Sequence, residues 1–128
     1  MNVLLDTSAY SALLRGHQPI LEVMRRSETV AVSAVVLGEL YSGFRAGNRC
    51  AENMAQLAQF LSKPSVRVLK VIEETALRYA EVDVYLRKAG RPIPRNDVWI
   101  AASALEHGLQ LLTLDVHFRE IPLLLIQP

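Results

Sequence analysis

The sequence lacks the features that mark exported, disulfide-rich and membrane proteins. Cys50 is its only cysteine, so no disulfide can form within the chain and no cysteine-rich metal site is available. No apolar run reaches the ~18 residues that a membrane span needs, and no basic leader precedes the first apolar residues. We therefore expect a soluble, cytoplasmic protein in a reducing compartment, with no membrane association.

The sequence also lacks an excess of charge of either sign. Its 14 Lys and Arg residues stand against 13 Asp and Glu residues, which leaves a formal net charge of +1. The total charge therefore neither indicates nor excludes a polyanionic partner. If several carboxylates were sequestered in one site, the remaining surface would be basic, so the distribution of charge matters more than its sum.

What the chain does have is apolar material, since 51% of its 128 residues are hydrophobic. This content, without repeats or linkers, predicts a single domain over residues 1–128. Short apolar segments alternate with segments of helical spacing, and the expected strands are residues 3–5, 29–32, 66–71, 109–112 and 123–126. Because these runs are mostly apolar, they predict an α/β fold, a three-layer α/β/α sandwich with a mostly parallel central sheet.

The stretch from Pro94 to Ser103 places an ionisable carboxylate at the start of an apolar helix. Asn96 reads as the helix N-cap, so Asp97 lies in the first turn, where the helix dipole favours an anion. The residues that follow are apolar, so the helix should be buried and should carry Asp97 to an interior cleft. Taken alone, this carboxylate is better explained as support for the helix start.

Three further carboxylates change that interpretation. Asp6 and Asp115 each follow an expected strand, and ligands of open parallel sheets bind at the carboxyl ends of the strands. Glu39 lies inside a helix, among residues that should face the core. If these three converge with Asp97, their mutual repulsion requires a counter-charge, and a divalent cation is the simplest one. Oxygen ligands favour Mg²⁺ or Mn²⁺, and the lack of paired His or Cys ligands argues against zinc.

Other polar residues near these acids are assigned supporting roles or none. Thr7, Ser8 and Thr113 stand beside candidate ligands and are expected to orient a carboxylate or a bound water. Helix capping or turn stabilisation is the alternative for all three, and for Ser8 it is the better one. The histidines lack metal-ligand spacing and are assigned no catalytic role; they are His17, His107 and His117.

Acid-rich Mg²⁺ sites typically act on phosphates, because the metal orients the phosphate, activates a water and stabilises the leaving oxygen. Phosphodiester hydrolysis is therefore the expected reaction. Nucleic acid also requires contacts to its backbone, and four basic residues precede Asp97: Arg87, Lys88, Arg91 and Arg95. Phosphate binding and a plain solvated face are equally compatible with their positions.

Four short motifs surround the candidate acids, in an order and at spacings that span nearly the whole chain. They are Leu5-Asp6-Thr7-Ser8, Gly38-Glu39-Leu40, Pro94-Arg95-Asn96-Asp97 with Ile100-Ala101-Ala102, and Thr113-Leu114-Asp115-Val116-His117-Phe118. Together they resemble the motifs of PIN-domain ribonucleases of the VapC toxin type. One departure is Pro122-Leu123, where many relatives have a glycine, and it affects only the expected local turn.

The resemblance implies a fold, an activity and partners. The implied fold is an α/β/α sandwich, and the implied activity is that of a Mg²⁺- or Mn²⁺-dependent endoribonuclease. The implied metal site consists of Asp6, Glu39, Asp97 and Asp115. The implied partners are an RNA substrate and a small VapB-like antitoxin that occupies the cleft, with the toxin as a homodimer or in a hetero-oligomer with its antitoxin.

The first hypothesis is thus the toxin of a toxin–antitoxin pair, which cuts structured RNA such as tRNA or ribosomal RNA by a metal-activated water. The alternative is a non-catalytic PIN-fold module that binds protein or RNA, and the presence of all four acids favours the enzyme. A phosphate-accepting receiver or phosphatase is a weaker third hypothesis, because Asp6 has no second Asp nearby. Apolar residues in excess of the core's needs, at residues 53–61 and in the first helices, predict an antitoxin groove or dimer face.

Overall fold

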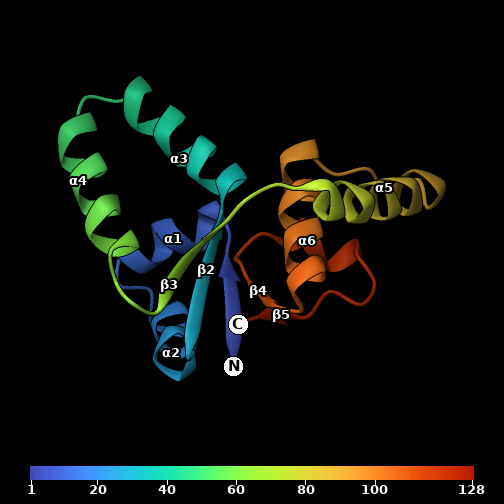
Figure 1. The fold of residues 1–128 in the computed structure, drawn as a ribbon, viewed down its shortest axis with the longest axis horizontal. Coiled ribbons are helices and arrows are strands. Elements are labelled where there is room, and N and C mark those ends of the chain that lie inside the picture. Colours follow the sequence, from blue (N-terminus) through green and yellow to red (C-terminus); the bar gives the residue numbers. More distant parts are fainter.

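Five short strands form one parallel sheet in the order β3-β2-β1-β4-β5 (Figure 1). The computed structural model describes residues 1–128. The strands are β1 (Asn2–Leu5), β2 (Thr29–Ser33), β3 (Val66–Leu69), β4 (Gln110–Leu112) and β5 (Ile126–Gln127). In register, Leu5 lies beside Val32 and Leu112, so the three central strands end at one edge of the sheet. Residues that directly follow these strands, such as Asp6 and Thr113, therefore meet at that edge.

Six helices and one short 3-10 helix cover the sheet. They are α1 (Thr7–Leu14), α2 (Gln18–Arg26), α3 (Ala34–Ala46), α4 (Cys50–Leu61), α5 (Glu73–Lys88), α6 (Arg95–His107) and η1 (Val116–Glu120). In Figure 1, α1, α2 and α4 lie on one side of the sheet, and α5 and α6 lie on the other. The predicted α/β/α sandwich is confirmed, and all strand pairs are parallel. None of the helices has the length and apolar character needed to cross a membrane.

The strands form the centre of the core because their side chains are apolar on both faces of the sheet. Val3, Leu4 and Leu5 of β1 have no exposed surface, and the same holds for Leu111 and Leu112 of β4. Burial on both faces requires helices on both sides, as is typical of parallel sheets. Each such side chain stabilises the fold by roughly 1.5–3 kcal/mol. The ends of β1 and β4 are therefore firmly placed.

Helix α6 is buried along most of its length, as its apolar sequence predicts. Val98 and Ile100 are each only 1% exposed, and the helix packs against α5 and β4. Tyr79 of α5 stacks on Trp99 of α6, with the ring centroids 4.2 Å apart. These contacts hold the first turn of α6, and with it Asp97, above the carboxyl edge of the sheet.

The start of α1 differs from the prediction. The N-cap is Asp6, whose Oδ1 accepts a hydrogen bond from the backbone N–H of Ala9 at 2.8 Å. Neither Thr7 nor Ser8 is the cap, because the helix begins one residue after the strand ends. An Asp in this position satisfies one of the free N–H groups of the first turn. The hydroxyl groups of Thr7 and Ser8 therefore remain available for other contacts.

The start of α6 also differs, since Asn96 is not its N-cap. The Pro94 carbonyl already accepts hydrogen bonds from the N–H groups of Asp97 and Val98, so the helix begins at Arg95. Pro94 itself is the N-cap, with a φ of −54° and a ψ of 142°. Asn96 is thus a residue of the first turn, with a side chain that can contact another element.

The last predicted strand is mostly absent. Only residues 126–127 form β5, and β3 likewise ends at Leu69 rather than at residue 71. Leu123 has a φ of 67° and is 91% exposed. Pro122 removes a hydrogen-bond donor, and the left-handed conformation of Leu123 turns the chain out of an extended path. The turn thus occurs at Pro122-Leu123, where the sequence departs from the motifs of the resemblance, and its positive φ is one that glycine adopts without steric cost.

Candidate metal centre

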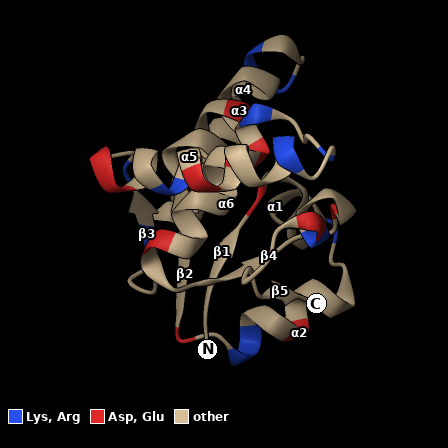
Figure 2. Ribbon diagram, turned by 90° about the vertical axis from the view of Figure 1, so that its right-hand side faces the viewer, with Lys and Arg blue, Asp and Glu red and all other residues tan.

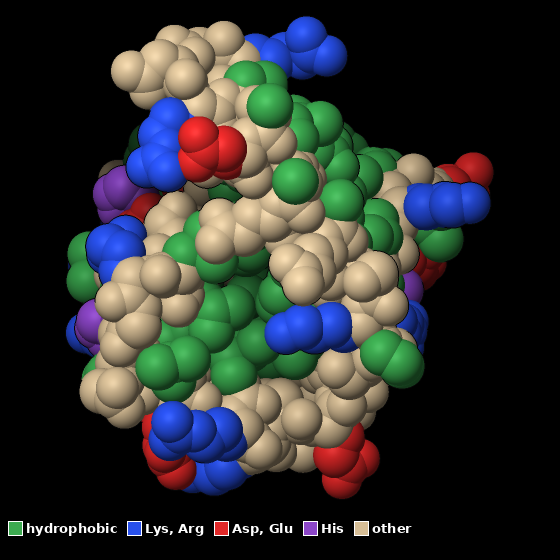
Figure 3. Space-filling view, turned by 90° about the vertical axis from the view of Figure 1, so that its left-hand side faces the viewer, with side chains coloured by type: hydrophobic (Ala, Val, Ile, Leu, Met, Phe, Trp, Pro, Cys, Tyr) green, Lys and Arg blue, Asp and Glu red, His purple; other side chains and the backbone are tan.

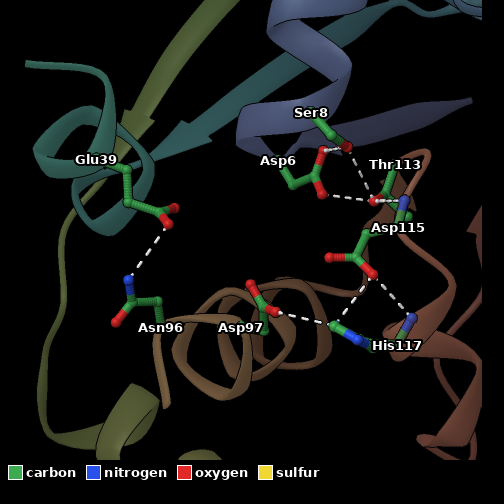
Figure 4. A network of polar contacts seen from close by, with 8 residues as sticks. All are labelled: Asp6, Ser8, Glu39, Asn96, Asp97, Thr113, Asp115 and His117. Atoms are coloured by element: carbon green, nitrogen blue, oxygen red, sulfur yellow. Dashed lines mark hydrogen bonds and ion pairs between the residues drawn. The ribbon is translucent and has the colours of Figure 1, made fainter. Parts of the chain in front are cut away.

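All four predicted acids line one cleft above the carboxyl edge of the sheet (Figure 4). Asp6 follows β1, Glu39 lies in α3, Asp97 lies in the first turn of α6, and Asp115 follows β4. The cleft has a volume of about 290 Å³, and its other lining residues are Thr7, Ser8, Ser11 and Ile100. The parallel order of the strands and the placement of α3 and α6 thus bring together carboxylates from distant parts of the chain.

Asp6 is 4% exposed and well provided with hydrogen bonds. Besides its cap bond to α1, its carboxylate accepts the Ser8 hydroxyl at 2.7 Å and the Thr113 hydroxyl. Each hydroxyl in turn accepts a backbone N–H from the turn after β4, that of Leu114 for Ser8 and that of Asp115 for Thr113. Burial raises the pKa of Asp6, although the hydrogen bonds from Thr113 and Ser8 act to lower it. These two hydroxyls therefore orient Asp6 and tie the ends of β1 and β4 together.

Asp97 lies across the cleft, and the structure shows no hydrogen bond to its carboxylate. Its side chain is 16% exposed, and Nδ1 of His117 lies 3.8 Å from its Oδ2. Burial is the largest cause that raises the pKa of Asp97 to about 6, and the charges of Asp115, Glu39 and Asp6 add to it. A carboxylate in this setting fits a divalent cation, because a positive charge would relieve the repulsion among the acids.

Glu39 is held by side chains from two other elements. The Thr7 hydroxyl donates to its Oε1 at 2.8 Å, and Nδ2 of Asn96 donates to its Oε2 at 3.2 Å. Thr7 belongs to α1 and Asn96 to α6, so these bonds connect the starts of both helices to α3. Thr7 orients a carboxylate as predicted, whereas Asn96 does so in place of the predicted helix cap.

His117, for which the sequence indicated no role, also lies at the cleft. Its Nδ1 is 3.2 Å from Oδ1 of Asp115, and its backbone N–H donates to the same oxygen at 2.9 Å. Asp97, Asp115 and His117 each offer one ligand atom within 4.8 Å of the others, a geometry that can hold a metal ion. The signal in the sequence is the Asp-x-His spacing: since Asp115 caps η1, the residue two positions later turns back towards it.

Basic residues lie in the last turn of α5, in the loop that follows and at the first residue of α6, beside the acidic residues above the sheet (Figure 2). Arg87 and Arg91 are each paired with an acid, at 3.1 Å and 2.6 Å. Lys88 and Arg95 are exposed and form no ion pair. Exposed ion pairs contribute at most about 1 kcal/mol, so a phosphate group can compete for the paired arginines. Lys88 and Arg95 would lose no ion-pair partner on contact with a phosphate.

The fold agrees with the comparisons to known proteins. The PIN domain family model matches residues 3–124, and the chain belongs to this family. Within the family it is similar to Ribonuclease VapC5 of Mycobacterium tuberculosis. The two are 32% identical over 114 residues, which cover 89% of this chain and 83% of that protein.

Solved structures of VapBC complexes have the same fold. The structure of VapBC2 from Rickettsia felis, bound to a DNA fragment from its promoter, contains a chain that matches with a TM-score of 0.86 and 27% identity, over 99% of this chain and 98% of that one. For VapBC-1 from nontypeable Haemophilus influenzae the TM-score is 0.85 and the identity 28%, over 99% and 97% of the two chains. The predicted resemblance to VapC-type PIN domains is confirmed.

Proposed function

We propose that this protein is a Mg²⁺- or Mn²⁺-dependent endoribonuclease and the toxin of a toxin–antitoxin pair. The observation that carries the proposal is the convergence of four carboxylates in one cleft, one of which, Asp97, has a pKa raised to about 6. Repelling acids gathered in a cleft serve catalysis by a cation and are costly in a module that only binds. The similarity to Ribonuclease VapC5 supports the same class of reaction.

All four acids are proposed to hold the cation. Asp6 and Asp97 are its central ligands, and Glu39 and Asp115 complete the site directly or through water. Carboxylate oxygens are the ligands that Mg²⁺ and Mn²⁺ prefer. When bound, the cation supplies charge neutralisation, orientation of the phosphate and activation of water.

The remaining residues of the cleft hold these acids in place. Ser8 and Thr113 fix the carboxylate of Asp6, and Thr7 and Asn96 fix that of Glu39, by the hydrogen bonds described above. Partners of this kind orient metal ligands, and the loss of a buried one typically reduces metal affinity or activity by about 10- to 100-fold.

The RNA is proposed to approach over the end of α5. Arg87, Lys88, Arg91 and Arg95 contact its backbone, with Lys88 and Arg95 contributing most because neither has an acidic partner. Contacts to phosphate carry no sequence information, so they position a folded RNA, such as tRNA or ribosomal RNA, rather than select its sequence.

A groove between α1 and α4 is proposed to bind the antitoxin. Figure 3 shows hydrophobic side chains gathered in a hollow of this face. The groove has a volume of about 330 Å³, and its lining residues are Leu13, Leu14, Gln56, Gln59, Phe60 and Lys63. It lies where the apolar residues of 53–61 and of the first helix predict an interaction surface. The matched structures from R. felis and H. influenzae are VapBC complexes, which supports a VapB-like partner and a homodimer or hetero-oligomer.

The test is RNA cleavage by the purified protein, with folded tRNA and ribosomal RNA as substrates. We expect cleavage in Mg²⁺ or Mn²⁺, none in EDTA, and a large loss for Glu39→Gln. The matched control is Glu28→Gln, because Glu28 is exposed and does not line the cleft. Cleavage that continues in EDTA would refute the metal-dependent reaction. Binding of RNA without any cleavage would favour a non-catalytic PIN-fold module.

A further inference from the structure

The imidazole of His117 is directed at the acidic cleft although its side chain is 53% exposed. Its Nδ1 lies 3.2 Å from Oδ1 of Asp115 and 3.8 Å from Oδ2 of Asp97, and Figure 4 shows it between these two carboxylates. The hydrogen bond from the His117 backbone N–H to Asp115 holds this residue at the start of η1. The turn at the start of η1 therefore places Nδ1 of His117 close to both acids.

The spacing of the three groups matches the first coordination shell of a divalent cation. Ligand atoms at about 2.1 Å from an ion lie roughly 3 to 4 Å apart from one another. The three ligand atoms of Asp97, Asp115 and His117 lie within 4.8 Å of one another, so small rotations of the side chains suffice. An imidazole that is half exposed can make such a rotation without disturbing the core.

The geometry is explained less well if the His117 imidazole only donates a hydrogen bond to Asp115. Oδ1 of Asp115 already accepts the backbone N–H of His117, so the imidazole is not required to hold that oxygen. Nδ1 also faces Asp97, which lies on a different element. A neutral imidazole with its proton on Nε2 presents a lone pair at Nδ1 towards the space between the two carboxylates.

We propose that His117 is a nitrogen ligand of the cation held by Asp97 and Asp115, and that it shifts the preference of the site from Mg²⁺ towards Mn²⁺. The proposal rests on the metal site of the proposed function. Both ions prefer oxygen ligands, but Mg²⁺ demands near-ideal octahedral oxygen geometry, whereas Mn²⁺, as the first ion of the divalent transition series, accepts an imidazole nitrogen more readily than Mg²⁺ does. An imidazole nitrogen added to the carboxylates of the cleft therefore discriminates between the two ions more than the four carboxylates alone do.

The experiment measures the bound metal directly. Electron spin echo spectroscopy of Mn²⁺ bound to the full chain should show coupling to a ¹⁴N nucleus, and this coupling should be lost in His117→Asn. Calorimetric titrations with Mn²⁺ and with Mg²⁺ give the affinity of the site for each ion. The ratio of the Mn²⁺ affinity to the Mg²⁺ affinity should fall by about tenfold in the variant. His107→Asn is the matched control, because His107 ends α6, about 15 Å along the helix from Asp97, and should leave both readouts unchanged.

Each outcome decides the matter. Bound Mn²⁺ without ¹⁴N coupling in the wild type, or an unchanged affinity ratio in His117→Asn, overturns the proposal while the ribonuclease stands if RNA is still cut. Failure of both ions to bind the wild-type cleft overturns the proposal together with the metal-dependent function. Thermal melting of His117→Asn in EDTA establishes that the variant is folded, as its exposed position leads us to expect.

Discussion

Asp6 and Asp97 face the same cleft, but the elements that carry them treat the two carboxylates in opposite ways. At the end of β1, Asp6 accepts hydrogen bonds from Ser8, Ala9 and Thr113, and it caps α1. At the start of α6, the carboxylate of Asp97 has no hydrogen-bond donor. Burial raises the pKa of both acids, that of Asp97 to about 6, but only Asp6 has hydrogen bonds that act against the rise. Asp6 therefore contributes to the fold as well as to the site, whereas Asp97 is a cost to the metal-free fold.

The difference shows that two carboxylates of one acidic cleft can affect the stability of the fold differently. A carboxylate at a strand end can be hydrogen-bonded by the turn of a neighbouring strand without leaving the cleft. A carboxylate in the first turn of a buried helix gains only from the helix dipole, which is worth about 0.3–1 kcal/mol. Metal-binding positions that oppose stability are expected where function dictates the residue. The predictions that follow set Asp97 against Asp6, from the largest effect to the smallest.

The largest effect is expected on catalysis, where substitutions of Asp6 and of Asp97 should have the same effect. Both Asp6→Asn and Asp97→Asn should lower RNA cleavage in saturating Mg²⁺ by about 1000-fold, because each removes a charged ligand worth several kcal/mol. Glu28→Gln, which changes an exposed carboxylate away from the cleft, is the matched control. If either cleft variant retained more than a tenth of wild-type activity, that residue would not be a central ligand.

The next largest effect is on stability without metal, where the two residues should differ in sign. In EDTA, Asp6→Asn should lose about 1–2 kcal/mol, since it disturbs a helix cap and a buried hydrogen-bond network. Asp97→Asn should gain on the order of 1 kcal/mol, because part of the repulsion is screened by solvent. The sequence alone predicts that neutralising either acid keeps or raises the stability of the metal-free protein. The hydrogen bonds of Asp6 reverse this expectation for Asp6. Thermal and urea melts in EDTA measure the change in the free energy of unfolding for each variant. Changes of the same sign and size would show that the two acids do not differ.

The pH dependence of that gain sharpens the comparison further. The pKa of Asp97 in the folded, metal-free protein is about 6, above the ordinary value of about 3.9 for Asp in an unfolded chain. Between these values the folded state binds more protons than the unfolded state, so wild-type stability falls as pH rises from about 4 to 6. The advantage of Asp97→Asn in EDTA should therefore be absent below pH ~4, grow through this window and level off near pH 7. Melting curves of both proteins across pH 4 to 7 provide the measurement, and an advantage independent of pH would refute the assignment to Asp97.

The smallest effect is expected at Asn96, which links the start of α6 to Glu39. Its hydrogen bond of 3.2 Å is exposed, so Asn96→Ala should weaken Mg²⁺ binding by only about 0.5 kcal/mol, or roughly twofold. Thr113→Val, which removes a buried donor to Asp6, should weaken it at least tenfold. Calorimetric titration of both variants with Mg²⁺ tests the order, and an effect of Asn96→Ala as large as that of Thr113→Val would contradict it.

Several features of the fold and site could be predicted because they depend on short stretches of chain. Apolar runs such as residues 3–5 and 109–112 indicate strands buried on both faces, and the helical segments between them indicate a parallel sheet. The rule that ligands bind at the carboxyl ends of such strands then singles out Asp6 and Asp115. Boundaries were harder, since the end of β3 and the turn at Leu123 depend on which hydrogen bonds the sheet completes.

The sequence by itself determined the class of fold and the four acids of the cleft, because the hydrophobic period and the strand ends are local properties. Only the tertiary structure decided what each acid touches: that Asp6 is held by Thr113 from β4, that Asn96 reaches Glu39, and that His117 turns towards Asp97. These contacts join side chains from separate elements, and their existence depends on distances of a few ångströms set by the packing of the whole core. The Asp-x-His spacing indicates only that His117 turns back towards Asp115, and no local pattern encodes the distance from His117 to Asp97 of α6.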